Sequence, residues 1–200
     1  MNHFLELEQM KKNILMVGLL LLVVIGSSAQ AKKENVFTTV PEVNGKVVFQ
    51  QFIHTDQGLD EDQVYSLLYK WGKDNYAGNP LLSGIRFNEK EKSITVSSKV
   101  ELLLPENSDG ERLKKMMNYR FDASVTNAGC VLIIRDVTFQ DATKSKGFFP
   151  KLTSAEEVIT DSALTASSAD KEYRENLRKG TLYFLNELYH DLKGVLTVSN

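Results

Sequence analysis

The spacing of apolar residues changes several times along the chain, and each change marks an expected element. The run Lys46 to His54 (KVVFQQFIH) is rich in Val, Phe and Ile between two turn-forming stretches, which predicts a strand. Helical spacing follows, because apolar residues recur at i, i+3, i+4 and i+7: Val64, Leu67, Leu68 and Trp71. Asp60 is placed to cap this helix, and Gln63 stands three residues later, as a capping box requires. We therefore expect a strand followed directly by a helix.

From Ser83 to Phe139 the period of the pattern is two, which predicts consecutive strands joined by short turns. Between residues 117 and 125 polar residues separate a regular apolar set: Met117, Tyr119, Phe121, Ala123 and Val125. Asn127-Ala128-Gly129 predicts a tight hairpin, with Gly129 available for positive φ, and Cys130 to Phe139 returns as the last strand. One face of each strand is apolar and the other polar. The pattern therefore predicts a meander of four strands covered on one side.

A long amphipathic helix is expected near the C-terminal end, starting at Ser167-Ser168. Its apolar stripe has helical spacing: Tyr173, Leu177, Phe184, Leu185, Leu188 and Leu192. Gly194 is expected to end it, and Gly180 weakens its middle by about 1 kcal/mol relative to Ala. The segment Thr143 to Ser168 before it is expected to be irregular, with one helical turn at Ala155 to Ile159. The order β-α-β-β-β-β-α predicts an α+β fold, with an antiparallel sheet and the helices packed on one face.

The N-terminal region has the three-part pattern of a signal peptide. The apolar run Ile14 to Ile25 is preceded by Lys11-Lys12 and followed by small residues that end in Ala29-Gln30-Ala31, a motif that signal peptidase accepts. A permanent membrane helix is the alternative, but crossing a bilayer takes about 20 apolar residues and this run is shorter. We expect cleavage after Ala31 and no membrane span in the mature protein. Acidic residues before the two lysines are unusual, so translation is expected to start at Met10.

The expected signal peptide determines the expected division into domains and the expected cellular compartment. Residues 1–31 are the expected signal peptide, residues 32–44, polar with Pro41, an expected linker, and residues 45–200 a single α+β domain. At 200 residues, with 42% hydrophobic and 25% charged residues, the chain has the composition of one ordinary globular domain. The mature protein is expected to be exported, either to the periplasm or out of the cell.

Charge and cysteine content narrow the classes of partner and chemistry. The formal net charge is -2, and no dense basic run occurs outside Lys32-Lys33 and Lys114-Lys115. Nucleic-acid binding is therefore not expected, because phosphate recognition concentrates Lys and Arg on one face. Cys130 is the single cysteine, so no intramolecular disulfide can form. Its place at an apolar strand favours a buried thiol; a nucleophilic thiol is the alternative and needs a nearby histidine or cation.

The sequence offers few of the residue patterns that enzymes need. Neither Gly-x-Ser-x-Gly nor Gly-x-x-x-x-Gly-Lys occurs, which argues against the common serine hydrolases and nucleotide enzymes. His54 and His190 stand far apart in sequence, and neither has the companion histidine of a zinc hydrolase motif. Glu156-Glu157 could supply the paired carboxylates of a glycosidase, although neighbours in sequence usually point apart.

Two acidic stretches resemble calcium-binding loops. Asp56, Asp60 and Asp62 have suitable side chains, but Leu67 stands where an EF-hand requires a bidentate Glu, so helix capping accounts for them better. The stretch Asn107 to Glu111 also fails, because Pro105 would stand at the first ligand position, and it is expected to be a turn. No catalytic, cofactor-binding or metal-binding residue is therefore assigned, and no cofactor is expected.

The order of elements behind a signal peptide resembles a family of secreted proteins from gut-type Gram-negative bacteria called domain of unknown function 4468. The stretches that carry the resemblance are Val40 to Phe49, the capped helix through Trp71, and Tyr119-Arg120-Phe121 leading into Val131 to Phe139. The resemblance covers the last helix only loosely. It implies a TATA-box-binding-protein-like fold. It lends no catalytic or binding residues, and the name of the fold implies no DNA binding here.

The polar side of the predicted sheet is the surface that could carry a function. If the helices cover the apolar side, the other side presents a plane of mixed charge: Thr95, Ser97, Lys99, Glu101, Asn118, Arg120, Asp122 and Ser124. A merely solvated sheet face is one interpretation, since antiparallel sheets commonly leave one side wet. A docking plane for a protein or glycan is the other.

Two functions are consistent with these patterns. The favoured one is a non-catalytic exported module that binds an unknown protein or glycan of the cell envelope. The alternative is a hydrolase with an unrecognised carboxylate site that acts on an envelope or extracellular substrate. A deep pocket that gathers Asp, Glu or His side chains with shifted pKa values favours the enzyme, whereas a shallow patch favours the docking module.

Overall fold

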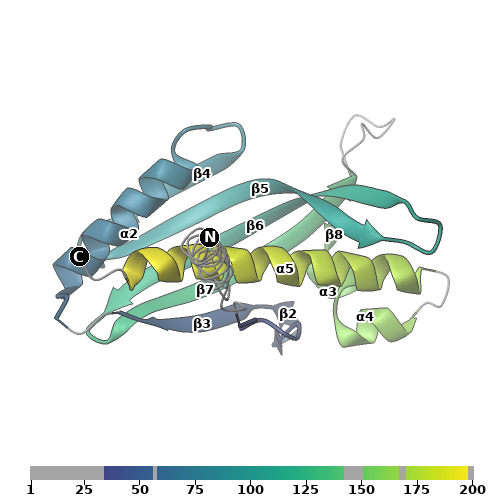
Figure 1. The fold of residues 1–200 in the computed structure, drawn as a ribbon, viewed down its shortest axis with the longest axis horizontal. Coiled ribbons are helices and arrows are strands. Elements are labelled where there is room, and N and C mark those ends of the chain that lie inside the picture. The colour runs from purple at the N-terminus through teal and green to yellow at the C-terminus, as the bar shows by residue number, and fades with distance from the viewer. Residues whose placement is uncertain (1–33, 56–57, 142–150, 167–169, 198–200) are drawn as a thin grey trace, which may run out of the picture. The chain divides into compact units, whose positions relative to one another are not determined.

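The computed structural model describes residues 34–55, 58–141, 151–166 and 170–197 (Figure 1). Apart from Glu34, these residues belong to one unit that spans Asn35–Asn200. The expected signal peptide, residues 1–31, lies outside the described residues and stays a prediction. Among the described helices, none combines the length and the apolar character that crossing a membrane requires.

One antiparallel sheet forms most of the fold. Its main strands are β3 (Phe49–His54), β4 (Ser83–Asn88), β5 (Ser93–Glu106), β6 (Arg112–Thr126) and β7 (Gly129–Asp141). Their order in the sheet is β3-β7-β6-β5-β4, and the short β8 (Thr153–Ser154) also pairs with β7. A separate hairpin consists of β1 (Glu42–Val43) and β2 (Lys46–Val47). The helices are α2 (Glu61–Tyr76), α3 (Ala155–Val158), α4 (Asp161–Ala166) and α5 (Lys171–Leu196). The predicted α+β fold with an antiparallel sheet is confirmed.

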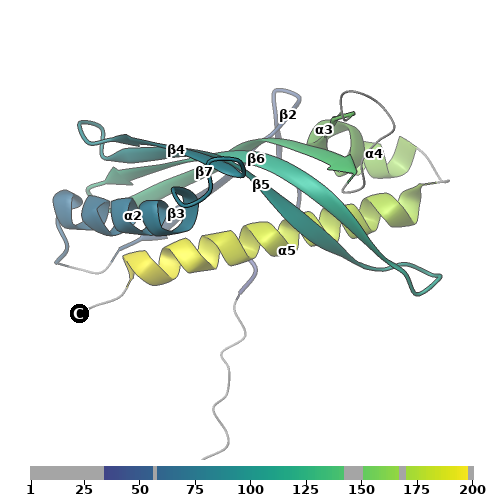
Figure 2. The ribbon, with the colours of Figure 1, turned by 90° about the horizontal axis from the view of Figure 1, so that it is seen from above.

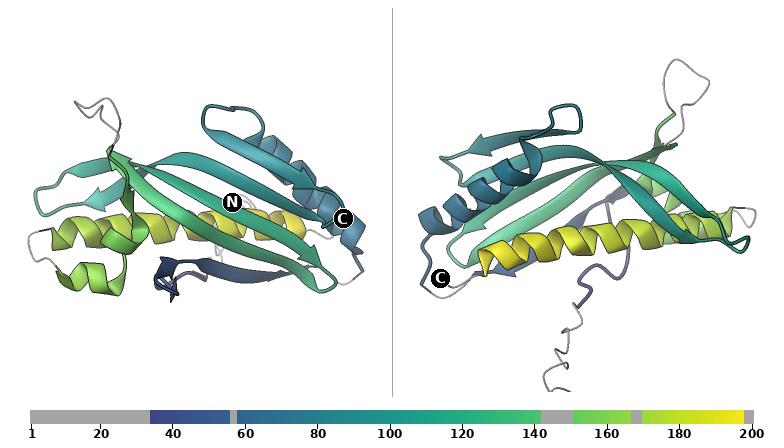
Figure 3. Two further views of the ribbon diagram at one scale, coloured as in Figure 1. Left: turned by 180° about the vertical axis from the view of Figure 1, so that it is seen from behind. Right: turned by 45° about the horizontal axis from the view of Figure 1, so that its top comes forward.

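The two long helices cover the same face of the sheet. Figure 2 shows α2 and α5 on one side of the strands, where α5 packs chiefly on β5 and α2 packs on β4, β5 and β6. From the opposite side the strands stand in front of α5 (Figure 3, left). The sheet therefore has a covered face and an outer face, and neither α2 nor α5 lies over the outer face.

Alternation along the strands decides which side chains enter the core. On β6 four of the five residues in the predicted apolar set are buried, Met117, Tyr119, Phe121 and Ala123, and the fifth, Val125, is half-buried. The ring of Phe121 lies 5.9 Å from that of Trp71 and 5.4 Å from that of Tyr76, measured between centroids. Trp71 Nε1 donates a hydrogen bond to Asp191 Oδ2 at 2.7 Å, which ties α2 to α5. The core thus fills the space between the covered face and the two helices.

Asp60 and Gln63 form the predicted capping box at the start of α2. The backbone N–H of Gln63 donates to Asp60 Oδ1 at 2.8 Å, and the backbone N–H of Asp60 donates to Gln63 Oε1 at 2.9 Å. On the predicted apolar stripe, Val64, Leu68 and Trp71 are buried. The cap sets where the helix begins, and the stripe sets which side of it packs on the sheet.

The hairpin turns form where the sequence predicts them. Between β5 and β6, Asn107 Oδ1 accepts hydrogen bonds from the backbone N–H groups of Asp109 and Glu111, at 3.1 and 2.8 Å. Gly129 at the start of β7 has a φ of +151°, and a Cβ at this position would lie 2.1 Å from the backbone oxygen of Ile53. Glycine is therefore needed here both for the turn and for the close approach of β3.

The linker expected at residues 32–44 needs correction over its described part, because the chain already packs on the domain there. Phe37 and Val40 are 5% and 7% exposed, so both belong to the core. Asn186 of α5 accepts hydrogen bonds from the backbone N–H groups of Val36 and Phe37, at 2.8 and 2.9 Å. Two apolar anchors are too few to make a periodic pattern, which is why the sequence suggests only a polar linker.

The C-terminal part of the fold also differs from expectation. The helix α5 begins at Lys171 and continues past Gly194, because Leu192 and Leu196 are fully buried and keep its last turn on the domain. The described residues 151–166 are more regular than predicted, since they contain β8, α3 and α4. The helical turn predicted at Ala155 to Ile159 is confirmed by α3.

Candidate functional site

The outer face carries the polar plane that the sequence predicts. Its side chains are half-buried or exposed and alternate with buried core residues: Thr95, Ser97, Lys99, Glu101, Asn118, Arg120, Asp122 and Ser124. Strand pairing brings them together, since Thr95 of β5 stands opposite Asp122 of β6, and Ser97 stands opposite Arg120. On the next strand, Arg135 of β7 stands opposite Arg120. Residues from β5, β6 and β7 therefore share one surface.

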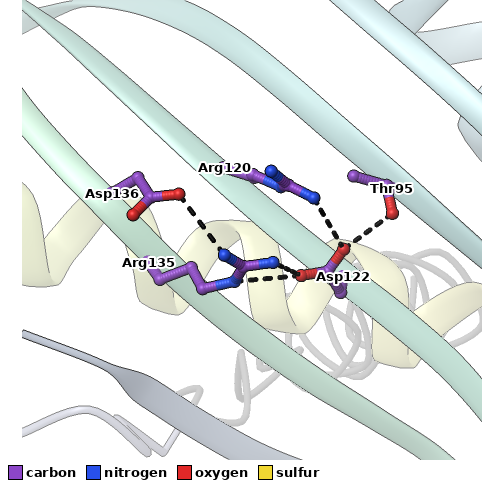
Figure 4. A network of polar contacts seen from close by, with 5 residues as sticks. All are labelled: Thr95, Arg120, Asp122, Arg135 and Asp136. Carbon is purple, nitrogen blue, oxygen red and sulfur yellow. Dashed lines mark hydrogen bonds and ion pairs between the residues drawn. The ribbon is translucent and has the colours of Figure 1, made fainter.

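A β-bulge interrupts the ladder between β6 and β7 at this surface. The register shifts between Asn118 and Arg120, so β7 has one extra residue there. Asp136 adopts a φ of +55°, a left-handed conformation that costs a non-glycine residue on the order of 1–3 kcal/mol. Because of the bulge, the sequence neighbours Arg135 and Asp136 both reach the outer face, where Arg135 Nη1 lies 3.5 Å from Asp136 Oδ2 (Figure 4). Bulges of this kind re-aim side chains next to functional sites.

Asp122 is the centre of a polar network on the outer face (Figure 4). Its Oδ2 accepts hydrogen bonds from Arg135 Nη2 at 2.7 Å and Nε at 3.1 Å, and its Oδ1 accepts one from Thr95 Oγ1 at 2.7 Å. Partial burial alone would raise the pKa of Asp122. The hydrogen bonds from Thr95 and Arg135 and the positive charges of Arg135 and Arg120 outweigh it, so the pKa lies below its ordinary value. Asp122 is thus held as a carboxylate.

Arg120 shares the carboxylate of Asp122 with Arg135 and lies farther from it. Its Nη2 lies 3.9 Å from Asp122 Oδ1, which is beyond hydrogen-bond distance. Its Nε is buried and has no hydrogen-bond partner among the described residues. It also stands directly opposite Arg135, and like charges in opposite positions destabilise a sheet. Arg120 therefore has one buried donor without a partner among the described residues and only a long ion pair with Asp122, which Arg135 holds more closely.

A shallow pocket of about 330 Å³ opens beside Arg120. We call it the bulge pocket, and its walls include Leu82, Ser97, Lys99, Asn118, Arg120 and Asp136. Asn118 Nδ2 donates to Thr138 Oγ1 at 3.1 Å, which orients its amide across the β6–β7 ladder. Lys99 and Arg120 supply two cationic groups to the same space, which suits an anionic ligand group.

Buried hydroxyl groups support the sheet beneath the bulge pocket. Tyr119, 4% exposed, shares hydrogen bonds with Tyr76 and Ser98, and Ser98 Oγ lies 2.7 Å from Ser83 Oγ. Burial raises the pKa values of both Tyr76 and Tyr119, so both phenols stay protonated. These contacts connect α2 with β4, β5 and β6. They satisfy polar groups in the core and hold the floor of the pocket in place.

Glu156 anchors the β1–β2 hairpin. Its Oε1 accepts a hydrogen bond from the backbone N–H of Val47 at 2.9 Å, whereas its neighbour Glu157 is exposed. Partial burial alone would raise the pKa of Glu156, but hydrogen bonds, first that of Val47, outweigh it and lower the pKa. A glycosidase acid needs a raised pKa, so the lowered pKa of Glu156 does not support the acid role for this residue.

A larger open cleft, of about 650 Å³, lies between α2 and the turn that joins β4 to β5. Its walls are formed by Asp62, Tyr65, Ser66, Tyr69, Phe87, Glu89 and Lys92. The rings of Tyr69 and Phe87 are 4.3 Å apart, and Lys92 Nζ lies 5.4 Å from the centroid of the Tyr65 ring. Lys92 also pairs with Asp62, so the chain's own ammonium group occupies the cationic position in this cleft.

The other residues that the sequence singles out lie at the end of a strand, on a helix or in the core. His54 is exposed at the end of β3, with its ring 4.8 Å from that of Phe52, and His190 packs beside a tyrosine on α5. Cys130 is fully buried, and burial raises the pKa of its thiol to about 12. Asp56 lies outside the described residues. Within the described part of the chain, no group of three or more His, Cys, Asp and Glu side chains could hold a metal ion.

Sequence reasoning missed Arg135 and Asp136, although a signal for them exists. In the strand from Val131 to Phe139, two adjacent polar residues shift the apolar parity between buried Ile134 and buried Val137. A parity shift of one residue inside an alternating strand is the pattern of a bulge. The polar plane predicted on β5 and β6 therefore extends onto β7.

Comparison with solved structures supports the fold. A TBP-like protein from Parabacteroides distasonis ATCC 8503 matches with a TM-score of 0.67 and 22% sequence identity, over 78% of this chain and 96% of that chain. A DUF4468 family protein from Bacteroides ovatus ATCC 8483 matches with a TM-score of 0.63 and 18% identity, over 82% of this chain and 94% of that chain. No family model and no curated protein matches the chain. At these identities the likeness establishes the TATA-box-binding-protein-like fold that the sequence resemblance implies, and it carries no residue roles.

Proposed function

We propose that the protein is an exported, non-catalytic module that docks a protein or glycan of the cell envelope on the outer face of its sheet. The observation that carries this proposal is the network of Asp122, Arg135 and Thr95 beside a cationic pocket, on a face that α2 and α5 leave uncovered. Export rests on the signal-peptide pattern of residues 1–31.

The outer face has the physical properties that a docking surface needs. Hydrogen bonds hold the side chains of Asp122 and Arg135 in place, so less conformational entropy is lost when a partner binds. They are still 25% and 36% exposed, which leaves them within reach of a partner. Mixed charges spread over three strands orient a partner and select against others. A shallow surface of this kind suits macromolecular contact better than enclosure of a small substrate.

The alternative, a hydrolase with a carboxylate site, has less support from the geometry. Such an enzyme needs a carboxyl group whose pKa is raised, so that it can donate a proton near neutral pH. Among the described residues, the carboxyl groups with a shifted pKa are Asp122 and Glu156, and both are shifted downward. Both are held ionised by structural partners, which favours docking over hydrolysis.

Photocrosslinking in the producing cells tests the proposal. A photoreactive amino acid is placed at Ser97 on the outer face, and as a control at Tyr183, which is 72% exposed on α5. We expect the Ser97 position to capture one defined envelope component, identified by mass spectrometry, and the Tyr183 position not to capture it. Charge reversal by Arg120→Glu together with Asp122→Arg should abolish the capture, with circular dichroism as the check of folding.

Capture of the same component from both positions, or capture that survives charge reversal, contradicts the docking face. Cell fractionation tests export separately. Protein that lacks residues 1–31 should be recovered outside the cytoplasm, and recovery of the full-length chain in the cytosol contradicts export.

A further inference from the structure

We propose that the bulge pocket binds a carboxylate group on a peptide segment of the partner, held between Arg120 and Lys99. This inference rests on the proposed function, because it names the chemical group that the outer face recognises. It makes the bulge pocket the specific subsite of the docking surface.

The balance of charge around the bulge is the first argument. Three cations, Lys99, Arg120 and Arg135, stand near two carboxylates, Asp122 and Asp136, which leaves one positive charge in excess. Both carboxylates lie close to Arg135, at 2.7 Å from Nη2 for Asp122 and 3.5 Å from Nη1 for Asp136. The charged residues that line the bulge pocket are two cations, Lys99 and Arg120, and one carboxylate, Asp136, so one positive charge is in excess there and a single bound carboxylate balances it.

The geometry of Arg120 and Lys99 is the second argument. Arg120 stands opposite Ser97 and Lys99 opposite Asn118, so the two cations are diagonal neighbours on β6 and β5. Diagonal neighbours are about 7–8 Å apart in a sheet, a span that one carboxylate can bridge between two long side chains. The Arg120 side chain is 32% exposed although its Nε is buried, so its terminal Nη groups are the donors that a ligand can reach, and their two parallel N–H bonds match the two oxygens of a carboxylate. A bound anion also offsets the repulsion between Arg120 and Arg135.

The apolar wall of the pocket favours a peptide over an acidic sugar. Leu82 lines the pocket and is 46% exposed, and its neighbour Leu81 is 85% exposed. An apolar side chain next to the carboxylate can therefore pack on leucine while the carboxylate meets the cations. The aromatic residue in the lining, Tyr119, is 4% exposed and offers no ring face on which a sugar could stack.

Titration of the isotope-labelled purified protein, followed by NMR, tests the inference with three small probes. N-acetylleucine carries a carboxylate beside an apolar side chain, N-acetylleucinamide replaces the carboxylate with a neutral amide, and methyl glucuronide presents the carboxylate on a sugar. We expect saturable shifts of the backbone amides of Leu82, Ser97, Lys99 and Arg120 with N-acetylleucine. The neutral amide and the sugar should each bind at least about tenfold more weakly, the smallest loss expected when a charge-assisted hydrogen bond or the apolar contact is missing.

Matched variants separate the pocket from general attraction to a cationic surface. Arg120→Gln removes the proposed ligand group and should weaken N-acetylleucine binding at least about tenfold. Arg86→Gln removes an exposed cation from β4, outside the lining of the bulge pocket, and should leave binding unchanged. Lys99→Gln changes an exposed side chain and provides the same test if Arg120→Gln impairs folding.

The outcomes distinguish this inference from the proposed function. Equal binding of the acid and the amide, or equal losses in Arg120→Gln and Arg86→Gln, overturns the carboxylate subsite. Tighter binding of methyl glucuronide overturns the choice of a peptide. If crosslinking from Ser97 still captures a partner after any of these results, docking stands and only the subsite fails. Failure of that crosslinking removes the docking function itself.

Discussion

Asp122 connects three strands through one carboxylate, and its removal has a predictable cost. Asp122→Asn should lower the free energy of unfolding by about 1–3 kcal/mol, because Arg135 loses a charged acceptor and faces Arg120 with no anion between them. Urea unfolding at pH 7 measures this change. Glu101→Gln is the matched control, since the Glu101–Lys114 pair on the neighbouring strands is exposed and such pairs contribute about 0–1 kcal/mol. Equal losses in the two variants would argue against the network.

The lowered pKa of Asp122 adds a dependence on pH. The folded-state pKa lies below the ordinary value of 3.8, so the stabilisation is fully present above that value and is lost as the pH falls through the folded-state pKa. The difference in unfolding free energy between the wild-type protein and Asp122→Asn should therefore stay constant from about pH 7 to pH 5 and shrink below about pH 4. A difference that persists undiminished into acid would show that the charge of Asp122 is not what stabilises the fold.

Cys130 should be chemically inert while the protein is folded. Its side chain is fully buried, and burial raises the pKa of the thiol to about 12, so almost no thiolate forms at pH 8. A thiol reagent such as Ellman's reagent should label it only after unfolding in guanidinium chloride. Because Cys130 is the single cysteine, the count of labelled thiols needs no further control. Rapid labelling of the native protein would instead support the nucleophilic alternative that the sequence leaves open.

Among the secondary-structure elements, α5 shows how packing overrides local preference. It contains Gly180 and Gly194, yet it is helical from Lys171 to Leu196. The two glycines differ in their surroundings. A Cβ at Gly180 would lie 3.1 Å from Leu104 Cδ2, whereas a Cβ at Gly194 would have nothing within 4 Å. Gly180 thus stands where α5 approaches β5 closely, and Gly194 has no such contact.

Alanine at these two positions should separate helix propensity from packing. Gly194→Ala should raise the free energy of unfolding, by at most about 1 kcal/mol, because alanine has the higher helix propensity and the added methyl group meets open space. Gly180→Ala should gain less or lose stability, because Leu104, 2% exposed, has to move. Urea unfolding of both variants gives the comparison. An equal gain at both positions would mean that the contact with Leu104 does not restrict α5.

At the scale of the whole molecule, the buried side-chain amide of Asn186 holds the chain at Val36 and Phe37 on the domain. Asn186 is 4% exposed, its Oδ1 accepts from the N–H groups of Val36 and Phe37, and its Nδ2 donates to the backbone oxygen of Phe37 at 2.9 Å. Three backbone groups far from Asn186 in sequence thus depend on one side chain. This arrangement joins the chain before β1 to α5.

Removal of this amide should release the segment. Asn186→Ala should lower the free energy of unfolding by about 1–3 kcal/mol, because buried backbone groups lose their partners. Hydrogen exchange at the amides of Val36 and Phe37 should become faster in the variant. Asn176→Ala is the control, since Asn176 is also buried but its bond to the backbone oxygen of Glu106 is longer, at 3.4 Å. Unchanged exchange at Val36 and Phe37 would show that the apolar anchors alone hold the segment.

Local spacing was enough to predict the α+β class, the capped helix and the two sides of the sheet. The capping box of Asp60 and Gln63 depends on residues three positions apart, and the buried side of β6 depends on alternation within one strand. Both are short-range properties of the chain, so they can be predicted without knowing which strands pair. The same holds for the polar set on β5 and β6, which was assigned to one face by parity alone.

The bulge pocket depends on contacts between strands and could not be derived in this way. The β6–β7 hairpin, whose turn the sequence does predict, brings Arg135 opposite Arg120, but the bulge within it and the pairing of β5 with β6 decide which side chains line the pocket. Arg120 has only a long ion pair, because Arg135 on the opposite strand forms the hydrogen bonds to Asp122. Long-range packing also explains why Phe37 joins the core and why α5 continues past Gly194. In each case, burial and charge interactions with residues on other elements outweigh the local preference of the chain. Spacing along the chain does not identify those neighbouring residues, so it does not predict the free energies of these interactions.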